Sequence, residues 1–307
     1  MRTPVDLGQG VKVLTFEPPP AGFDFEKATE AEREKYGMPK FPNAESEQRF
    51  FEAVKGRRII EPQFKPRDRK RSRLPGLNRD AHGVETTNIW SGGVVYNPSG
   101  DPIWDVNGTW NIPKPSLPSG AKNGIWYTAS SWVGIDGDGG SGDVLQAGCD
   151  ADIITSGGSP QIQYNPWWEW YPAGSYWITN MPAKAGDQFF CWIQCIPLLV
   201  GTKANSAMIL LANDTQGFVM FYFPTAPSKT MLAGNCAEWI LEGFPTKGQP
   251  TLPKYTTVKF TNCAAVTVKG KALYPDKGNT INMVDSSGTV ISKGKDVGKR
   301  GVDVSYV

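Results

Sequence analysis

The residues best suited to chemistry lie between Ser131 and Gly148, in the stretch SWVGIDGDGGSGDVLQAG. Two strand-like runs, SWVGI and DVLQAG, flank an acidic, glycine-rich connection. Glycines at this density supply positive φ values without steric cost, so a hairpin or a short irregular loop is expected. Because side chains alternate along a strand, Trp132 and Asp136 share one face of the first run. With Gln146 from the second run, an indole, a carboxylate and an amide would meet in one groove.

A second stretch, AEWILEGF, supplies two carboxylates. Glu238 and Glu242 are four residues apart, so both face the same way on a strand. A glutamate can activate a water molecule as a general base and then return the proton to a leaving amine. A neutral glutamine amide can donate to the developing oxyanion without titrating. These residue types are sufficient for peptide hydrolysis, and spacing alone leaves open which glutamate is the base.

The residue counts argue against other hydrolytic centres and against a metal. His82 is the single histidine and lies in a polar, basic segment, which disfavours a serine or cysteine triad and excludes a histidine-ligated zinc centre. The five cysteines show no metal-ligand spacing, so neither a metal nor a cofactor is expected. Cys191 and Cys195 would lie ~13 Å apart on one face of a strand, too far for a disulfide. The sequence leaves any other pairing open.

The composition favours strands over helices. The 307 residues include 34 Gly, 25 Pro, 11 Trp, 10 Tyr and 14 Phe, and from Asn88 onward short apolar runs alternate with turn sequences such as TSGGSP and ANDTQG. We expect an all-β fold, an antiparallel two-sheet β-sandwich, with a largely extended or helical N-terminal appendage. The sequence contains no run of ~18 apolar residues, so it predicts no membrane span. MRTPVDLGQG lacks the apolar run of a secretory signal.

Residues 1–85 differ in kind from residues 86–307 and are expected to form a propeptide-like segment ahead of a catalytic sandwich. They contain two helix candidates, ATEAEREKYG and SEQRFFEAVKG, and a proline-broken basic run from Lys65 to Arg73. The formal net charge is only +2, and no aromatic residue lies within the basic run, which argues against nucleic-acid binding. A peripheral or inhibitory role is favoured for this segment.

Eight motifs between Asn88 and Val307 resemble, in order, those of the glutamic peptidases, the eqolisin family. They are IWSGGVV, GTWNIPK, SWVGIDGDG, VLQAG, WWEWYP, NCAEWILEGF, VKFTNC and VSYV. These enzymes are acid-active endopeptidases best known as secreted fungal proteins. The resemblance implies a concanavalin A-like jelly roll of two seven-stranded sheets with a substrate groove on its concave face. It also implies a Gln/Glu catalytic dyad, polypeptide substrates, a monomer, a secreted location, and an N-terminal propeptide that acts as an intramolecular inhibitor.

Position by position, the resemblance assigns Gln146 as the catalytic glutamine. It favours Glu242, just before Gly243 and Phe244, as the catalytic glutamate, with Glu238 as the competitor. The positions assigned to the substrate groove are Glu238, Trp132, Asp136, Glu169, Trp168 and Phe244. Where the family has an acidic residue ahead of its W-Y-E-W-Y-P motif, this chain has Asn165, which removes one carboxylate.

Two other functions are compatible with a sandwich. In a glycoside hydrolase, Glu238 and Glu242 would be the carboxylate pair and PWWEWYP the sugar platform. Strand geometry puts the Cα atoms of the two glutamates ~13 Å apart. This distance is wider than the ~5–9.5 Å separation of the two carboxyl groups that glycoside hydrolases use. Gln146 also has no role in that reaction. A non-catalytic, lectin-like carbohydrate-binding module would show no proteolysis at any pH.

Overall fold

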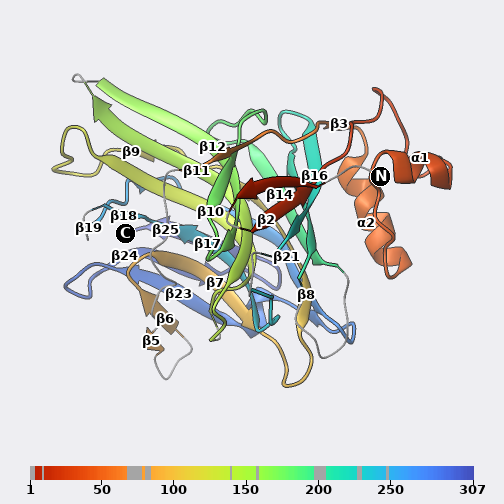
Figure 1. The fold of residues 1–307 in the computed structure, drawn as a ribbon. Helices are drawn as coiled ribbons and strands as arrows, with labels where there is room; N and C mark the ends of the chain where they lie inside the picture. Colours follow the sequence, from red (N-terminus) through yellow and green to blue (C-terminus); the bar gives the residue numbers. More distant parts are fainter. Residues whose placement is uncertain are drawn as a thin grey trace.

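Strands make up most of the structure and confirm the predicted antiparallel β-sandwich (Figure 1). The computed structural model describes residues 4–8, 10–67, 78–79, 84–138, 140–156, 159–196, 205–226, 230–246 and 249–307. Two sheets pack face to face, and we call them the front sheet and the back sheet.

The front sheet consists of strands that pair antiparallel along their whole order. In spatial order they are β13 (Ser175–Ile178), β12 (Ser159–Tyr171), β11 (Val144–Ser156), β10 (Trp126–Asp136), β17 (Cys236–Glu242), β7 (Trp90–Tyr96) and β23 (Asn279–Val284).

The back sheet is also antiparallel and is extended by two strands from the N-terminus. Its order is β21 (Val258–Thr267), β8 (Ile103–Asn111), β14 (Gln188–Cys195), β15 (Ala207–Asn213), β16 (Phe218–Thr225), β2 (Val11–Leu14) and β1 (Val5–Gly8). Two further strands, β24 (Val290–Asp296) and β25 (Val302–Tyr306), connect β23 of the front sheet to β21 of the back sheet.

The shorter elements lie at sheet edges and in connections. They are β3 (Arg58–Ile59), β4 (Phe64–Pro66), β5 (Asn78–Arg79), β6 (Val84–Thr87), β9 (Pro115–Ser116), β18 (Pro245–Thr246), β19 (Gln249–Pro250), β20 (Lys254–Tyr255), β22 (Ala272–Leu273) and the 3-10 helix η1 (Pro275–Lys277).

The main core fills the space between the sheets, and alternation along each strand decides which residues enter it. In β10, Ala129, Val133 and Ile135 belong to this core. Ser130 and Trp132 alternate with these residues and point to the opposite, outer face. Trp132 is nevertheless 0% exposed. The front sheet is therefore covered on both faces along β10, which explains why nearly every residue of this strand is buried rather than every second one.

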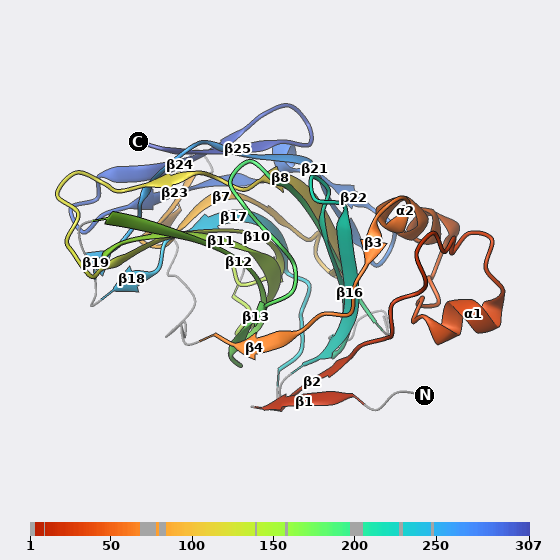
Figure 2. The ribbon, with the colours of Figure 1, turned by 90° about the horizontal axis from the view of Figure 1, so that it is seen from above.

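Both predicted helices are present. Helix α1 (Glu30–Lys35) begins after Thr29, whose side chain forms a capping box with Glu32. Helix α2 (Ala44–Val54) begins after Asn43, whose side chain accepts from the Ser46 N–H. Figures 1 and 2 show both helices beside β16, at the end of the molecule away from β10–β12. Among the described residues, no helix is long and apolar enough to cross a membrane.

The N-terminal segment touches both sheets. β2 pairs with β16 of the back sheet, while β4 pairs with the β13 edge of the front sheet. β6 pairs in parallel with β23, near the other edge of the front sheet. The predicted boundary between residues 85 and 86 stays a prediction. His82 and the part of the basic run after Arg67 lie outside the described residues.

All five cysteines are free and buried, in agreement with the predicted absence of a Cys191–Cys195 disulfide. Burial raises the pKa of every one of these thiols above its usual range. A buried thiol that stays protonated is a poor nucleophile, so none of the five should react readily in the folded protein.

This predicts a simple titration. In the native protein at about neutral pH, a thiol reagent such as 5,5′-dithiobis(2-nitrobenzoic acid) should label none of the cysteines, because none is exposed or ionised. After unfolding in guanidinium chloride, all five should be labelled. Rapid labelling of the native protein, or a melting temperature that falls on addition of a reductant, would contradict this.

Candidate active site

The register of four front-sheet strands places one row of polar residues across the middle of the sheet. Glu238 lies opposite Gly134, and Gly134 lies opposite Gln146. Gln146 in turn lies opposite Glu169 of β12. Directly opposed residues share a face, so these side chains all point to the outer face of the front sheet, which we call the site face.

A second polar row lies four residues further along the same strands. It joins Glu242, Ser130, Asp150 and Asn165 in the same strand order. Between the two rows lies a row that includes Trp132, opposite Gly148. Except for Asn165, the residues of the polar rows are nearly or fully buried, although they lie on an outer face.

The amide of Gln146 is held by a neighbouring carboxylate. Its Nε2 donates to Oε2 of Glu169 at 2.9 Å, and both side chains are buried. An ionised carboxylate can only accept hydrogen bonds, so Glu169 requires the NH₂ end of the amide to face it. The carboxylate thereby fixes the orientation of the Gln146 amide.

Trp132 lies between the two polar rows and binds the glutamate of the second. Its indole Nε1 donates to Oε2 of Glu242 at 3.1 Å. Two glycines make room for the indole: a Cβ on Gly134 would lie 2.9 Å from its Cζ3, and a Cβ on Gly148 would lie 2.6 Å from its Cβ. A side chain at either position would displace the group that holds Glu242.

Asp150, in the second polar row, is the centre of a cluster of charged and aromatic side chains on the site face. Its Oδ1 accepts from Arg67 Nη2 at 2.6 Å and from Ser130 Oγ at 2.7 Å. The Arg67 guanidinium lies 4.8 Å from the ring centroids of both Trp167 and Phe244. The Arg67 and Asp150 side chains are 1% and 0% exposed, so this is a buried ion pair with aromatic cover.

Glu238, at one end of the first row, and Asp136, two residues beyond Gly134 on β10, serve the surrounding loops. The Asp136 carboxylate accepts from the backbone N–H groups of residues 233–235. Glu238 Oε1 accepts from the Asp138 N–H at 3.0 Å and from Cys236 Sγ at 3.4 Å. Burial raises the pKa of both carboxyls, and for Glu238 the charge of Asp138 adds to the effect.

The structure brings most of the predicted site residues to one face. Gln146, Glu242, Glu238, Glu169 and Trp132 all lie on the site face, and Phe244 reaches it over the Arg67 guanidinium. Asp136 follows at the end of β10, where its carboxylate anchors the loop at residues 233–235.

Trp168 does not reach the site face. It is opposite Ala147 and lies in the main core, where it packs against Phe64, Tyr176 and Tyr222. The neighbouring Trp167 occupies the site face instead, as alternation along β12 requires.

Sequence reasoning missed Asp150 and Ser130. Alternation would have found both, since Asp150 follows Gln146 by four residues and Ser130 precedes Trp132 by two. What alternation does not reveal is that Arg67, distant in sequence, pairs with Asp150. Within the described ranges, no cluster of His, Cys, Asp and Glu has the makings of a metal site.

Comparisons with known proteins agree with this fold. A family model described as the Peptidase A4 family matches residues 88–306. Aspergillopepsin-2 from Aspergillus niger is 28% identical over 268 residues, which cover 82% of this chain and 88% of that protein. Scytalidopepsin B from Scytalidium lignicola is 26% identical over 230 residues, or 70% of this chain and 80% of its own.

Two solved structures share the sandwich. Scytalido-glutamic peptidase with a transition state analog inhibitor superposes with a TM-score of 0.58 at 24% identity, covering 72% of this chain and 98% of that one. Aspergilloglutamic peptidase from Aspergillus niger gives a TM-score of 0.50 at 28% identity, covering 59% of this chain and 99% of that one. Fold and relatives together define a glutamic peptidase, a hydrolase acting on peptide bonds. Since the family model spans most of its length, the chain belongs to the Peptidase A4 family, and the resemblance to the eqolisins is confirmed.

The buried carboxyl of Glu238 predicts how stability depends on pH. Its folded-state pKa is raised above the usual 4.5, so its neutral form stabilises the fold below about that pH. This contribution is lost as the pH rises through the folded-state pKa. The variant Glu238→Gln, which is neutral at every pH, should therefore lose less stability than wild type between about pH 4 and about pH 7.

Urea unfolding across that range measures the difference, which should approach about 1.4 kcal/mol for each unit of pKa shift that falls within it. The matched control is Glu45→Gln, because the Glu45 side chain is 85% exposed. Parallel stability curves for wild type and Glu238→Gln would show that Glu238 does not titrate in this way.

Proposed function

We propose that this protein is an acid-active endopeptidase in which Glu242 activates water and Gln146 stabilises the oxyanion. The observation that carries the proposal is the position of these two side chains on the strands flanking β10, on one face, with Trp132 between their rows. The membership in the Peptidase A4 family supports the same assignment.

The two glutamates differ in how they are bound, and the difference favours Glu242 as the base. Glu238 is buried with a raised pKa, so it stays protonated under acidic conditions, and a protonated carboxyl cannot accept the proton of water. Glu242 is equally buried, but it accepts an indole N–H from Trp132, whose position between the two polar rows orients the Glu242 carboxyl on the site face.

Gln146 is suited to the oxyanion role because its amide is oriented before substrate binds. An amide nitrogen carries two N–H donors. One of them binds Glu169, and we assign the other to the developing oxyanion of the scissile peptide. A donor fixed in place needs no reorganisation during the reaction, which is the main source of oxyanion stabilisation.

We further propose that the N-terminal segment inhibits the enzyme by entering the site face at Arg67. The Arg67 N–H donates to the Ser175 carbonyl at 2.9 Å, continuing the pairing of β4 with the β13 edge. Peptides often bind proteins by adding a strand to a sheet edge in this way. The Arg67 side chain then binds Asp150, which lies in the same row as Glu242.

The course of the chain supports this inhibitory role. Arg67 lies at one edge of the front sheet, and Val84 begins β6 near the other edge. The link between these two residues therefore joins opposite edges of the sheet that carries the site. We extend the proposal to a secreted, monomeric zymogen that acts on polypeptides and needs no cofactor, nucleic acid or membrane.

The catalytic assignment predicts the effect of two substitutions on casein hydrolysis between about pH 2 and about pH 7. Gln146→Ala should lower kcat by about 10²–10³-fold, because an oxyanion donor is lost. Glu242→Gln should lower it by about 10²–10⁴-fold, because the general base is lost. The exposed Gln163 and Glu45 supply matched controls, Gln163→Ala and Glu45→Gln, which should retain full activity.

Glu238→Gln distinguishes the two glutamates. If it is inactive while Glu242→Gln still processes casein, the base assignment is wrong although the family assignment stands. A glycoside hydrolase or a lectin-like module would show no proteolysis in wild type, and Gln146→Ala would leave its glycan hydrolysis or glycan binding unchanged.

The inhibitory contact predicts that Arg67→Ala speeds self-processing. The substitution leaves the Asp150 carboxylate without its buried cation, which weakens the hold of the segment on the site face. Conversion followed by intact mass at acid pH should be faster than in wild type by about tenfold or more. Arg58→Ala, at an exposed arginine of the same segment, is the control and should convert at the wild-type rate. Equal rates for both variants would remove Arg67 from the inhibitory role.

A further inference from the structure

Helix α2 packs on the outer face of the back sheet, which is the face of the sandwich opposite to the candidate site (Figures 1 and 2). We call residues 11–59, which contain β2, α1, α2 and β3, the N-terminal clamp. From the clamp, Phe25, Phe50, Ala53 and Val54 are buried in one apolar cluster. The buried members that the sandwich contributes are Trp192, Met208, Leu210, Ala212, Val219 and Phe221.

A second attachment is the strand β2, which is part of the back sheet itself. Val13 is in register with Pro224, and its neighbours pair along β16. Val11 and Val13 are both 0% exposed and belong to the main core between the sheets. Releasing the clamp would therefore open the main core as well as the outer face.

The third attachment is a buried charge. Arg49 Nη1 donates to Asp105 Oδ1 at 2.8 Å, while Trp192 Nε1 donates to the other carboxylate oxygen at 2.7 Å. The Asp105 side chain is only 2% exposed. Arg49 also lies over the Trp192 ring, 5.2 Å from its centroid. Dissociation of the clamp would break this ion pair, and truncation of Arg49 alone would leave the Asp105 carboxylate covered but without its cation, which is costly.

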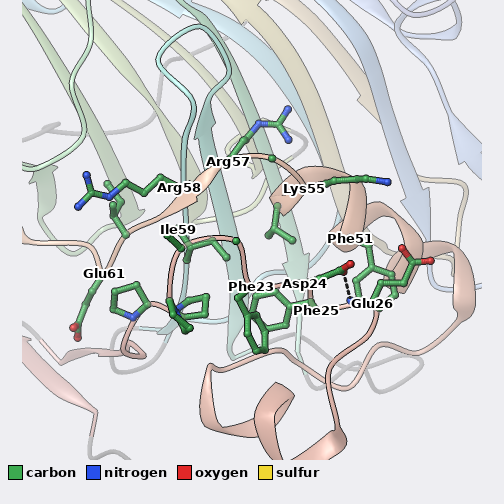
Figure 3. Close-up of a pocket in the computed structure, with 18 of the residues that line it drawn as sticks. Phe23, Asp24, Phe25, Glu26, Phe51, Lys55, Arg57, Arg58, Ile59 and Glu61 are labelled. Atoms are coloured by element: carbon green, nitrogen blue, oxygen red, sulfur yellow. Dashed lines mark hydrogen bonds between the residues drawn. The ribbon is translucent and has the colours of Figure 1, made fainter.

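The remaining space at this end lies within the clamp and the residues next to it. A cavity of about 880 Å³ is lined by residues 18–26, 51, 54–61 and Asn180, several of which Figure 3 labels. Nearly all of its lining comes from the N-terminal segment, so the cavity does not separate the clamp from the back sheet. The contact between clamp and sheet is closed by packed aromatic rings, such as Phe50 against Phe221 at 5.1 Å.

We infer that the clamp stays bound to the sandwich as a separate chain after the link between Arg67 and Val84 is cut, so that the active enzyme is a non-covalent two-chain protein. The inference rests on the proposed zymogen only in that a cut in this link precedes activity. Opening the site face requires that Arg67 leaves Asp150, and this contact lies on the other sheet from the contacts of the clamp. Dissociation of the clamp would in addition expose the apolar outer face of the back sheet, and such a surface favours aggregation.

The test uses the full chain and does not depend on its activity. A recognition sequence for a sequence-specific endopeptidase is inserted between Ser72 and Arg73 in the Gln146→Ala variant, and the protein is cut at about neutral pH. Denaturing mass spectrometry confirms the cut, and size-exclusion chromatography follows. We expect both chains to elute together at the mass of the uncut protein and to separate only in guanidinium chloride. Elution of the N-terminal chain by itself under native conditions would overturn the inference.

A pair of arginine variants tests the contacts. In the cut protein, Arg49→Ala should raise the dissociation constant of the two chains, measured by dilution, at least about tenfold. Arg58→Ala should leave this constant at the wild-type value. If Arg49→Ala does not fold, a urea titration of the cut wild type replaces it. Separation of the two chains at a urea concentration well below the one that unfolds the sandwich would contradict the inference. Wild type exposed to acid completes the test. Absence of self-cleavage counts against the zymogen proposal alone, whereas cleavage followed by loss of the clamp counts against the two-chain enzyme.

Discussion

The site depends on strand β10 being hydrogen-bonded on both sides, between β11 and β17. These two ladders fix the register in which Gln146 and Glu238 share one row and Glu242 and Asp150 share another. A slip of one residue would turn every one of these side chains into the core and bring core residues to the surface. The buried apolar residues of β10 on its inner face prevent such a slip. Packing between the sheets therefore sets the positions of the polar groups on the outer face.

Four carboxyl groups lie in the two polar rows of the site face, and the fold treats each differently. Burial raises the pKa of Glu238, Arg67 neutralises Asp150, the Gln146 amide donates to Glu169, and an indole N–H binds Glu242. Like charges so close together would otherwise repel one another strongly in a buried region. Because each carboxyl group has its own hydrogen-bond or charge partner, the face can hold several acids side by side.

Local patterns in the sequence were enough to predict the sandwich, both helices and the face shared by Trp132 and Gln146. Trp168 shows the limit of motif matching: it adjoins Glu169, and neighbouring strand residues point to opposite faces, so only one of the two can lie on the site face. The pairing of Arg67 with Asp150 was beyond prediction, because no local pattern reports a contact between residues 83 positions apart. The preference for Glu242 over Glu238 that we propose likewise rests on their different hydrogen-bond partners, which spacing does not contain.

The pairings from β7 through β23, β24, β25 and β21 to β8 join the two sheets into one continuous ladder. A peptidase at high concentration meets other copies of itself as potential substrates. Endopeptidases cut backbone that can be drawn out and bound in extended form, and a strand paired on both sides offers none until the sheet opens. The strands along this ladder are therefore expected to be poor substrates for a second copy, and a cut in the native protein should fall in a connection rather than in one of these strands.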